Sequence, residues 1–149
     1  MPATITINGD KRVVERLGKI QSFVKSPKKA FNEVGNMLVE EFQDNFPAEG
    51  QRLGARWEKL AKSTMIQKAR LGYGAKPILV RTGKLMRGFK KQVTNLMVRV
   101  HNPVSYFRYH QLGEGHNPKR RMIDAPERIK QDIIEILRRH LDEALKGRL

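Results

Sequence analysis

Two long segments of this 149-residue chain carry apolar residues at helical spacing, and they constrain its fold more than any other feature. Ser26-Pro27 predicts the start of the first helix, because a capping serine followed by proline is typical of a helix N-terminus. Asp124-Ala125-Pro126-Glu127 is a second capping signature, which predicts a long C-terminal helix. The apolar stripes are Phe31, Val34, Leu38, Phe42 and Phe46 in the first helix, and Ile129, Ile133, Ile136, Leu137, Leu141 and Leu145 in the second. We expect both helices to pack through these stripes.

Shorter elements are predicted on the N-terminal side of this frame. Thr4-Ile5-Thr6-Ile7 alternates and is rich in β-branched residues, so it predicts a short strand that ends at Asn8-Gly9. Asp10 then predicts the cap of a further helix. The apolar residues on one side of that helix are Val13, Val14, Leu17, Ile20 and Val24.

The middle of the chain predicts two short helices. Thr64 and Gln67 have the spacing of a capping box, which predicts a helix that ends near Leu71. Thr82 predicts the cap of another short helix.

A hairpin and one helical turn follow. Residues 91–100 predict two strands around Thr94-Asn95, and the residues expected to face inward are Leu96, Val98 and Val100. Residues 106–112 predict a single helical turn. The predicted fold class is α+β: a small antiparallel sheet packed with several α-helices, a long C-terminal helix and an extended basic loop, in one domain over residues 1–149.

The extended loop follows Pro47, where Gly50, Gly54 and the single tryptophan, Trp57, lie among charged residues. We interpret Trp57 as an anchor that is buried in its own subunit or at an interface. Residues 52–91 contain twelve Lys and Arg and one acid, so they hold +11 of the net charge of +15. This charge favours an acidic protein face or nucleic acid as partner, and its plainer interpretation is a solvated surface.

The sequence contains no pattern that predicts catalysis or a bound cofactor. His101, His110 and His116 come without an HExxH, paired-Cys or clustered-carboxylate pattern, so a metal-dependent nuclease is only a third hypothesis. His140 lies among charges and is expected on the surface. The chain has no cysteine, no apolar run of about 20 residues and no signal-peptide pattern, so we expect a protein made and used inside a cell, without a membrane partner.

Short phrases occur in a distinctive order between Phe46 and Gly113. They are Phe46 with Gly50, Trp57-Glu58-Lys59-Leu60, Ser63-Thr64, Lys68, Leu79, Arg81-Thr82-Gly83-Lys84-Leu85, Tyr106 and His110-Gln111-Leu112-Gly113. As an ordered set they resemble the phage virion morphogenesis family, the tail-completion or neck proteins of Mu-like and related tailed phages. That family commonly continues with a Pro-Ala-Arg-Pro-Phe-like strand, whereas this chain has Arg120-Arg121-Met122-Ile123-Asp124-Ala125-Pro126. The contact usually made there is therefore an open question.

The resemblance implies a structural virion protein rather than an enzyme. It implies a homo-oligomeric ring, six- or twelve-fold, that is assembled in the host cytoplasm. In the virion this ring joins the connector to the tail-terminator and tail proteins at the head–tail junction and lets DNA pass. The alternative function is a sequence-independent nucleic-acid-binding protein that uses residues 52–91.

The candidate functional residues form two groups, one for interaction with partners and one for a structural motif. The candidates for interaction are Arg52, Arg56, Trp57, Lys59, Lys68, Arg81, Lys84, Lys90 and Lys91. The candidates for a structural motif are Thr82, Gly83, Leu85, Tyr106, His110, Gln111 and Gly113. Within the motif, Gly83 permits close backbone approach, Leu85 is expected in the core, and Tyr106 shares a face with His110. His110 and Gln111 are expected to hydrogen-bond to loop backbone and so to position residues 47–80.

Overall fold

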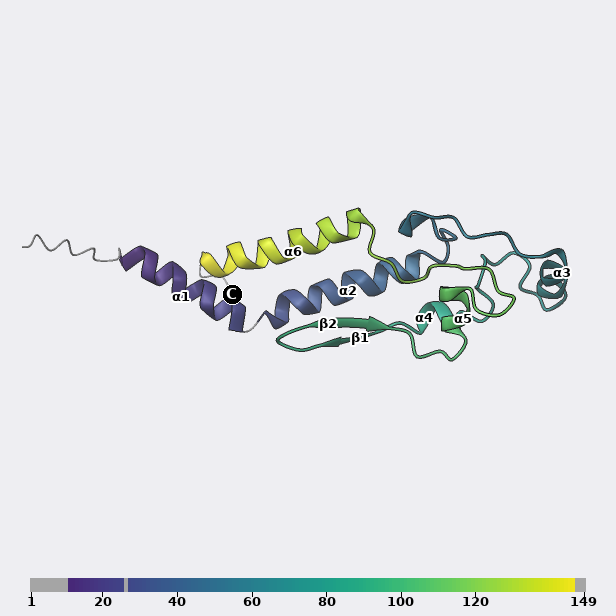
Figure 1. Ribbon diagram of the computed structural model, residues 1–149, viewed down its shortest axis with the longest axis horizontal. Coiled ribbons are helices and arrows are strands. Elements are labelled where there is room, and N and C mark those ends of the chain that lie inside the picture. Colours follow the sequence, from purple (N-terminus) through teal and green to yellow (C-terminus); the bar gives the residue numbers. More distant parts are fainter. Residues whose placement is uncertain (1–10, 26, 147–149) are drawn as a thin grey trace, which may run out of the picture.

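The computed structural model describes residues 11–25 and 27–146, which form an elongated molecule (Figure 1). Its elements are α1 (Lys11–Lys25), α2 (Lys28–Asp44), the 3₁₀ helix η1 (Gln51–Leu53), α3 (Lys62–Arg70), α4 (Lys84–Arg87), β1 (Lys90–Val93), β2 (Val98–His101), α5 (Phe107–Leu112) and α6 (Glu127–Leu145). They confirm the α+β class. The predicted strand at residues 4–7 and the predicted caps Asp10 and Ser26 lie outside the described residues.

Helix α2 lies between α6 on one side and the β1–β2 hairpin on the other (Figure 1). It begins at Lys28, one residue later than the sequence predicts, because Pro27 is the N-cap residue and not the first residue of the helix. Val34 and Phe42 of its stripe are buried, and Phe46, just beyond its end, is also buried. Within the described residues, no helix is both long enough and apolar enough to cross a membrane.

The predicted hairpin is confirmed, and it packs directly on α2. Its strands are antiparallel, with Lys90 opposite His101. Gly35 of α2 allows the close approach, because a Cβ atom there would lie 3.1 Å from Val98 Cγ2.

The prediction for the hairpin turn is wrong. Four residues, Thr94 to Met97, connect the strands, and Thr94 Oγ1 accepts hydrogen bonds from the backbone N–H groups of Leu96 (3.2 Å) and Met97 (3.1 Å). This local turn leaves Leu96 91% exposed instead of facing inward. Val98 and Val100, which lie on the strand itself, are half-buried.

Helix α6 is confirmed, but Asp124 does not cap it. Pro126 precedes the first turn, and the Asp124 carboxylate instead accepts hydrogen bonds from its neighbour Ala125 N (2.8 Å) and from Arg121 Nη1 (2.8 Å). A proline at the N-cap moves the acidic side chain too far from the helix to reach its free N–H groups.

The expectation that His140 lies on the surface is also wrong. His140 is buried, and its Nε2 lies 2.8 Å from Glu33 Oε2 on α2. Arg139 pairs with the same carboxylate. Position 140 follows Ile129 by eleven residues, or about three helical turns, so it falls on the packed side of α6.

Helix α1 is confirmed, but none of its residues is buried. Val13, Val14, Leu17 and Val24 are 51–65% exposed. The helix lies beside the C-terminal end of α6, where Lys19 Nζ donates to the carbonyl of Leu145 (3.4 Å). Most of the apolar side of α1 is therefore uncovered within the described part of the chain, although Ile20 and Phe23 are half-buried.

The main core lies at the C-terminal end of α2. Its buried members are Phe42, Phe46, Leu53, Trp57, Ile78, Leu85, Phe89, Met122 and Ile129. Aromatic rings dominate it: Phe46 meets Trp57 edge-on at a centroid distance of 5.3 Å, and Phe89 lies 6.1 Å from Phe46. Segments far apart in the sequence are thus joined through one aromatic cluster.

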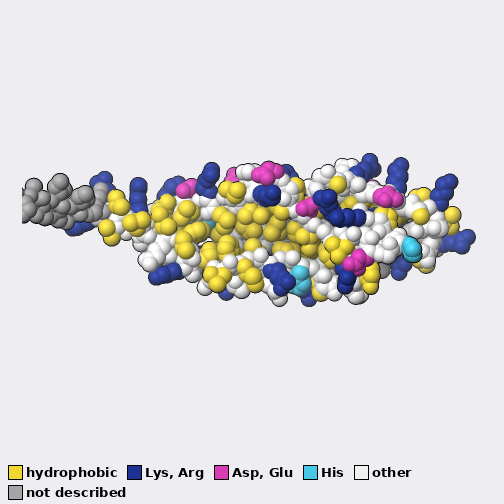
Figure 2. Space-filling model, viewed as in Figure 1, with side chains coloured by type: hydrophobic (Ala, Val, Ile, Leu, Met, Phe, Trp, Pro, Cys, Tyr) yellow, Lys and Arg dark blue, Asp and Glu magenta, His cyan; other side chains and the backbone are white. Residues whose placement is uncertain are grey.

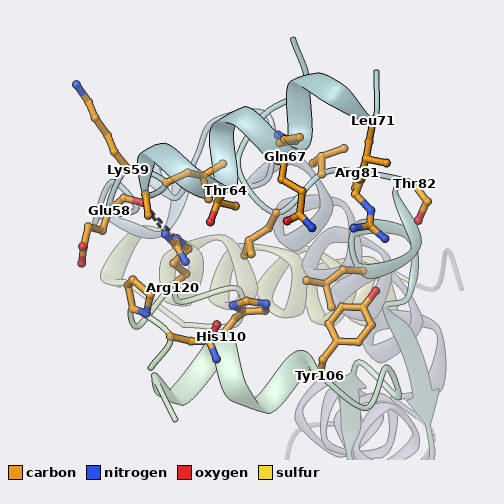
Figure 3. Close-up of a pocket in the computed structure, with 18 of the residues that line it drawn as sticks. Glu58, Lys59, Thr64, Gln67, Leu71, Arg81, Thr82, Tyr106, His110 and Arg120 are labelled. Carbon is orange, nitrogen blue, oxygen red and sulfur yellow. Dashed lines mark hydrogen bonds between the residues drawn. The ribbon is translucent and has the colours of Figure 1, made fainter. Parts of the chain in front are cut away.

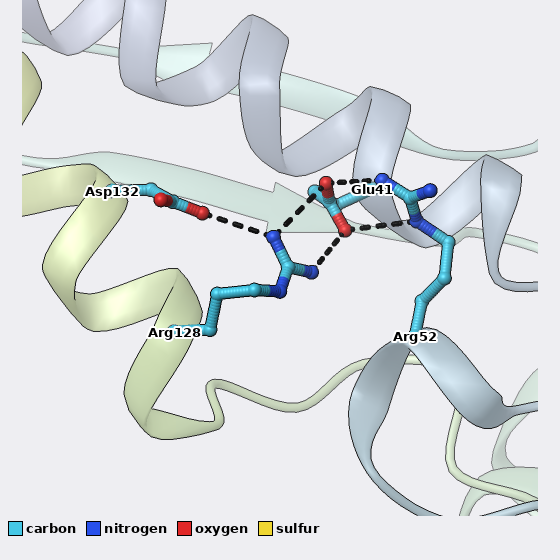
Figure 4. Close-up of polar contacts among 4 residues, drawn as sticks. All are labelled: Glu41, Arg52, Arg128 and Asp132. Atoms are coloured by element: carbon cyan, nitrogen blue, oxygen red, sulfur yellow. Dashed lines mark hydrogen bonds and ion pairs between the residues drawn. The ribbon is translucent and has the colours of Figure 1, made fainter.

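A carboxylate of α2 links two other elements beside this core (Figure 4). Glu41 has only 11% of its side chain exposed, and it accepts hydrogen bonds from Arg52 in η1 and from Arg128 in α6. Burial alone would raise the pKa of Glu41, but the hydrogen bonds from the two guanidinium groups outweigh burial and lower it below its ordinary 4.5.

We expect Glu41→Gln to destabilise the fold by roughly 1–2 kcal/mol at neutral pH, a modest loss because both arginines are partly solvated. A carboxylate whose pKa is lower in the folded state stabilises the protein above its unfolded pKa, and this contribution disappears as pH falls through the folded pKa. The difference between wild type and variant should therefore shrink below about pH 4.5. Urea unfolding across this range measures it. The exposed neighbour Glu40 provides the control, Glu40→Gln, and an equal effect of both variants would contradict the proposed link.

Candidate functional site

Most of the ordered phrases contribute residues to one cleft of about 870 Å³, whereas Phe46 and Gly50 lie outside its lining. It lies between residues 58–71, which include α3, residues 79–85, and residues 106–120, which include α5. Thr64 and Gln67 point from α3 toward His110 and Arg120 on the opposite wall (Figure 3).

Trp57 anchors the first wall. It is 4% exposed in its own subunit, and its indole N–H donates to the carbonyl of Arg121 (3.0 Å). The predicted capping box that follows is wrong: α3 begins at Lys62 after Ala61, which has the extended conformation of an N-cap residue (φ −59°, ψ 149°). Thr64 is therefore inside the helix, where its side chain faces the cleft instead of capping.

The second wall is the Arg81–Leu85 phrase. Thr82 is not the cap of α4, because Gly83 takes that position with a left-handed φ of 80°. Thr82 Oγ1 accepts only a long contact from Lys84 N (3.4 Å). The close approach expected at Gly83 is made by a side chain and not by backbone, because a Cβ atom there would clash with the Arg87 guanidinium. Leu85 is 3% exposed in the core, as expected.

The third wall begins with α5. The Tyr106 and His110 rings meet edge-on at 6.5 Å, which confirms that they share a face. The predicted hydrogen bond from the His110 side chain to residues 47–80 is not seen in the described part of the chain. Instead, the His110 backbone carbonyl accepts a hydrogen bond from Arg120 N (2.7 Å). Within the described residues His110 Nδ1 is buried without a hydrogen-bond partner. Burial, and then the charge of Arg120, lower the pKa of His110. Gly113 ends the helix in a left-handed conformation.

Gln111 makes the backbone contacts predicted for the motif, but to a different segment. Its Nε2 donates to the carbonyl of Ile123 (2.8 Å), and its Oε1 accepts from the N–H groups of Met122 (2.7 Å) and Ile123 (3.0 Å). It therefore positions residues 122–123 and not the predicted residues 47–80. This segment is where the sequence departs from the family pattern, and its contacts bury Met122 completely.

Two buried cations support the cleft walls. Lys68 is 8% exposed and its Nζ donates to the carbonyls of Lys76 and Pro77 (2.7 Å to the latter). Arg120 is 4% exposed and donates twice to the carbonyl of Glu58, at 2.9 and 3.2 Å. Burial lowers the pKa of both groups.

The remaining interaction candidates divide into three groups. Lys59, Arg81 and Lys84 line the cleft. Lys90 is exposed on β1, outside the cleft. The others contact their own subunit: Arg52 pairs with Glu41, Arg56 lies 3.8 Å from Glu49, and Lys91 donates to Asn32 Oδ1 (2.6 Å) and to Asn36.

Sequence reasoning missed Arg120 and Gln67 as parts of this site. The only signal for Arg120 was its place in the segment that departs from the family pattern, and Gln67 was assigned to the capping box. Among the residues that the structure describes, no group of three or more His, Asp or Glu could hold a metal ion.

The comparisons with known proteins agree with the ordered phrases. The model of the phage virion morphogenesis family matches residues 9–142. The protein is thus of the class that builds phage virions, and the chain belongs to the phage virion morphogenesis family. The comparisons found no match among curated proteins or solved structures.

Proposed function

We propose that this protein is a neck or tail-completion subunit, which forms a ring at the head–tail junction, joins the connector to the tail and lets DNA pass. The family match carries this proposal. It is supported by the convergence of most of the ordered phrases on one cleft, because loops held on a helical framework commonly form binding surfaces.

Assembly of identical copies is supported by the apolar surface. Apolar side chains extend along much of one face, from α1 past α6, with Lys and Arg mainly at its edges (Figure 2). Extended apolar patches of this kind are uncommon on soluble monomers and mark interaction sites. The charges also complement each other: residues 11–25 carry a net +4, whereas residues 28–44 and 127–145 together carry a net −3. We expect α1 to cover the face of a neighbouring copy.

The positions of the cations favour a protein partner over a nucleic acid. Several of the twelve cations in residues 52–91 form contacts inside the subunit, among them Arg52, Lys68 and Lys91. A sequence-independent nucleic-acid binder depends on solvent-facing cations that reach phosphates.

We expect loss of this protein to leave filled heads and tails that are complete but separate. A stop codon early in the gene, in a phage that carries it, tests this by negative-stain electron microscopy of the lysate. Expression of the wild-type protein in trans should restore joined virions. Joined virions in its absence would contradict the proposed function, and so would purified protein that binds duplex DNA tightly with a steep salt dependence but does not join heads to tails.

A further inference from the structure

The cleft is supported by two buried cations that form no ion pair among the described residues, although Glu49 acts on Lys68 and Glu58 on Arg120 from farther away. Arg120 and Lys68 are each less than 9% exposed, and their hydrogen bonds go to backbone carbonyls. Within the described residues no carboxylate pairs with either head group. A buried charge without a counter-ion is unfavourable, so an anionic group that enters the cleft would be stabilised there.

The rest of the lining extends this charge to the mouth of the cleft. Six cations and one acid, Glu58, line it. Lys59, Lys62, Arg81 and Lys84 are exposed, so they remain accessible to a ligand. A concave site with one sign of charge concentrates ligands of the opposite sign.

The apolar part of the lining indicates which anion fits. Leu60, Leu71, Leu79 and Val80 line the same cleft as the cations. Aliphatic walls can pack against the apolar side chains of a peptide. A nucleic-acid backbone presents phosphates and sugars and has no such side chains, so a peptide fits the cleft better. Thr64 and Gln67 add polar groups that can bond to a peptide backbone (Figure 3).

From this combination we infer that the cleft binds an extended acidic peptide segment of another virion protein, with carboxylates directed toward Arg120 and Arg81 and aliphatic side chains against the leucines. This inference rests on the proposed function and names the class of partner that the cleft takes. The bound segment supplies a carboxylate close to Arg120, which has no ion-pair partner among the described residues.

Photo-cross-linking in infected cells tests the occupant of the cleft. p-Benzoyl-phenylalanine is incorporated at Thr64 or Gln67, with Gln92, exposed on β1 outside the cleft, as the control position. We expect both cleft positions to cross-link to a segment of another virion protein, identified by mass spectrometry, in which Asp and Glu outnumber Lys and Arg. The control position should not capture this segment. Cross-links from the cleft to neutral or basic segments, to DNA alone, or to nothing would overturn the inference.

Removal of positive charge from the cleft tests whether its cations bind the acidic segment. Arg81→Gln with Lys84→Gln removes two charges from the cleft, and Lys90→Gln with Arg99→Gln removes two exposed charges elsewhere. The cleft pair should lower the cross-link yield from Gln67 about tenfold, and the control pair less than twofold, at equal urea stability. Equal losses would overturn the inference. The gene-loss experiment tests the neck function separately, so joined heads and tails that require the protein, together with a non-acidic cross-linked segment, would refute the cleft inference alone.

Discussion

Trp57→Ala should destabilise the folded subunit by about 3–5 kcal/mol, the range for removing a large aromatic side chain from a core. The indole is 4% exposed, packs edge-on against Phe46 and donates to the carbonyl of Arg121. Its loss opens a cavity and removes one of two hydrogen bonds to that carbonyl. The other hydrogen bond, from Asn45 Nδ2 (3.2 Å), remains. Trp57 is the only tryptophan, so the variant has no tryptophan fluorescence. Urea unfolding of both proteins is therefore followed by far-ultraviolet circular dichroism.

Trp57→Phe separates packing from hydrogen bonding in the same experiment. It keeps an aromatic ring against Phe46 and removes the N–H donor, so its cost should lie between wild type and alanine, at about 1–2 kcal/mol. If Trp57→Ala left the urea midpoint unchanged but abolished head–tail joining, Trp57 would be an interface anchor instead of a core residue.

Gly50→Ala should cost about 2–5 kcal/mol, because two penalties add there. Gly50 has a left-handed φ of 94°, which by itself costs an alanine roughly 1–2 kcal/mol. A Cβ atom would also lie 2.5 Å from Trp57 Cδ1 and clash with the carbonyl of Ala55. Overpacking of this kind typically costs a further 1–3 kcal/mol, since the obstacles are backbone and a buried ring.

Gly54 is the matched control in the same turn. It has nearly the same backbone conformation, with φ 87°, but a Cβ atom added there would meet nothing within 4 Å. Gly54→Ala should therefore cost only the conformational term, about 1–2 kcal/mol. Equal urea midpoints for the two variants would show that the contact with Trp57 is not the reason for glycine at position 50.

Several predictions from sequence succeeded because they depend on periodic patterns. The stripe of α2 and the apolar residues of α6 define two helices whose packed sides follow from 3.6-residue spacing. The ordered phrases identify the family from the sequence alone, and the place of Leu85 in one phrase predicts its position in the core.

Predictions about caps failed because capping depends on where the backbone actually turns. Thr64, Thr82 and Asp124 each have suitable side chains, but the helices nearby begin after Ala61, Gly83 and Pro126. A shift of one to three residues is enough to place a capping side chain inside the helix or beyond its reach.

The sequence alone determined the helical frame, the hairpin, the family and the concentration of positive charge, since all of these follow from local spacing, composition or an ordered motif. Only the tertiary structure decided which charges are free. Arg52 is neutralised by Glu41 eleven residues earlier, while Arg120 is buried against the carbonyl of Glu58, 62 residues away, and has no carboxylate partner among the described residues. Burial and pairing arise from contacts between distant segments, and no local pattern encodes which cation will meet an acid and which will be left to face the cleft.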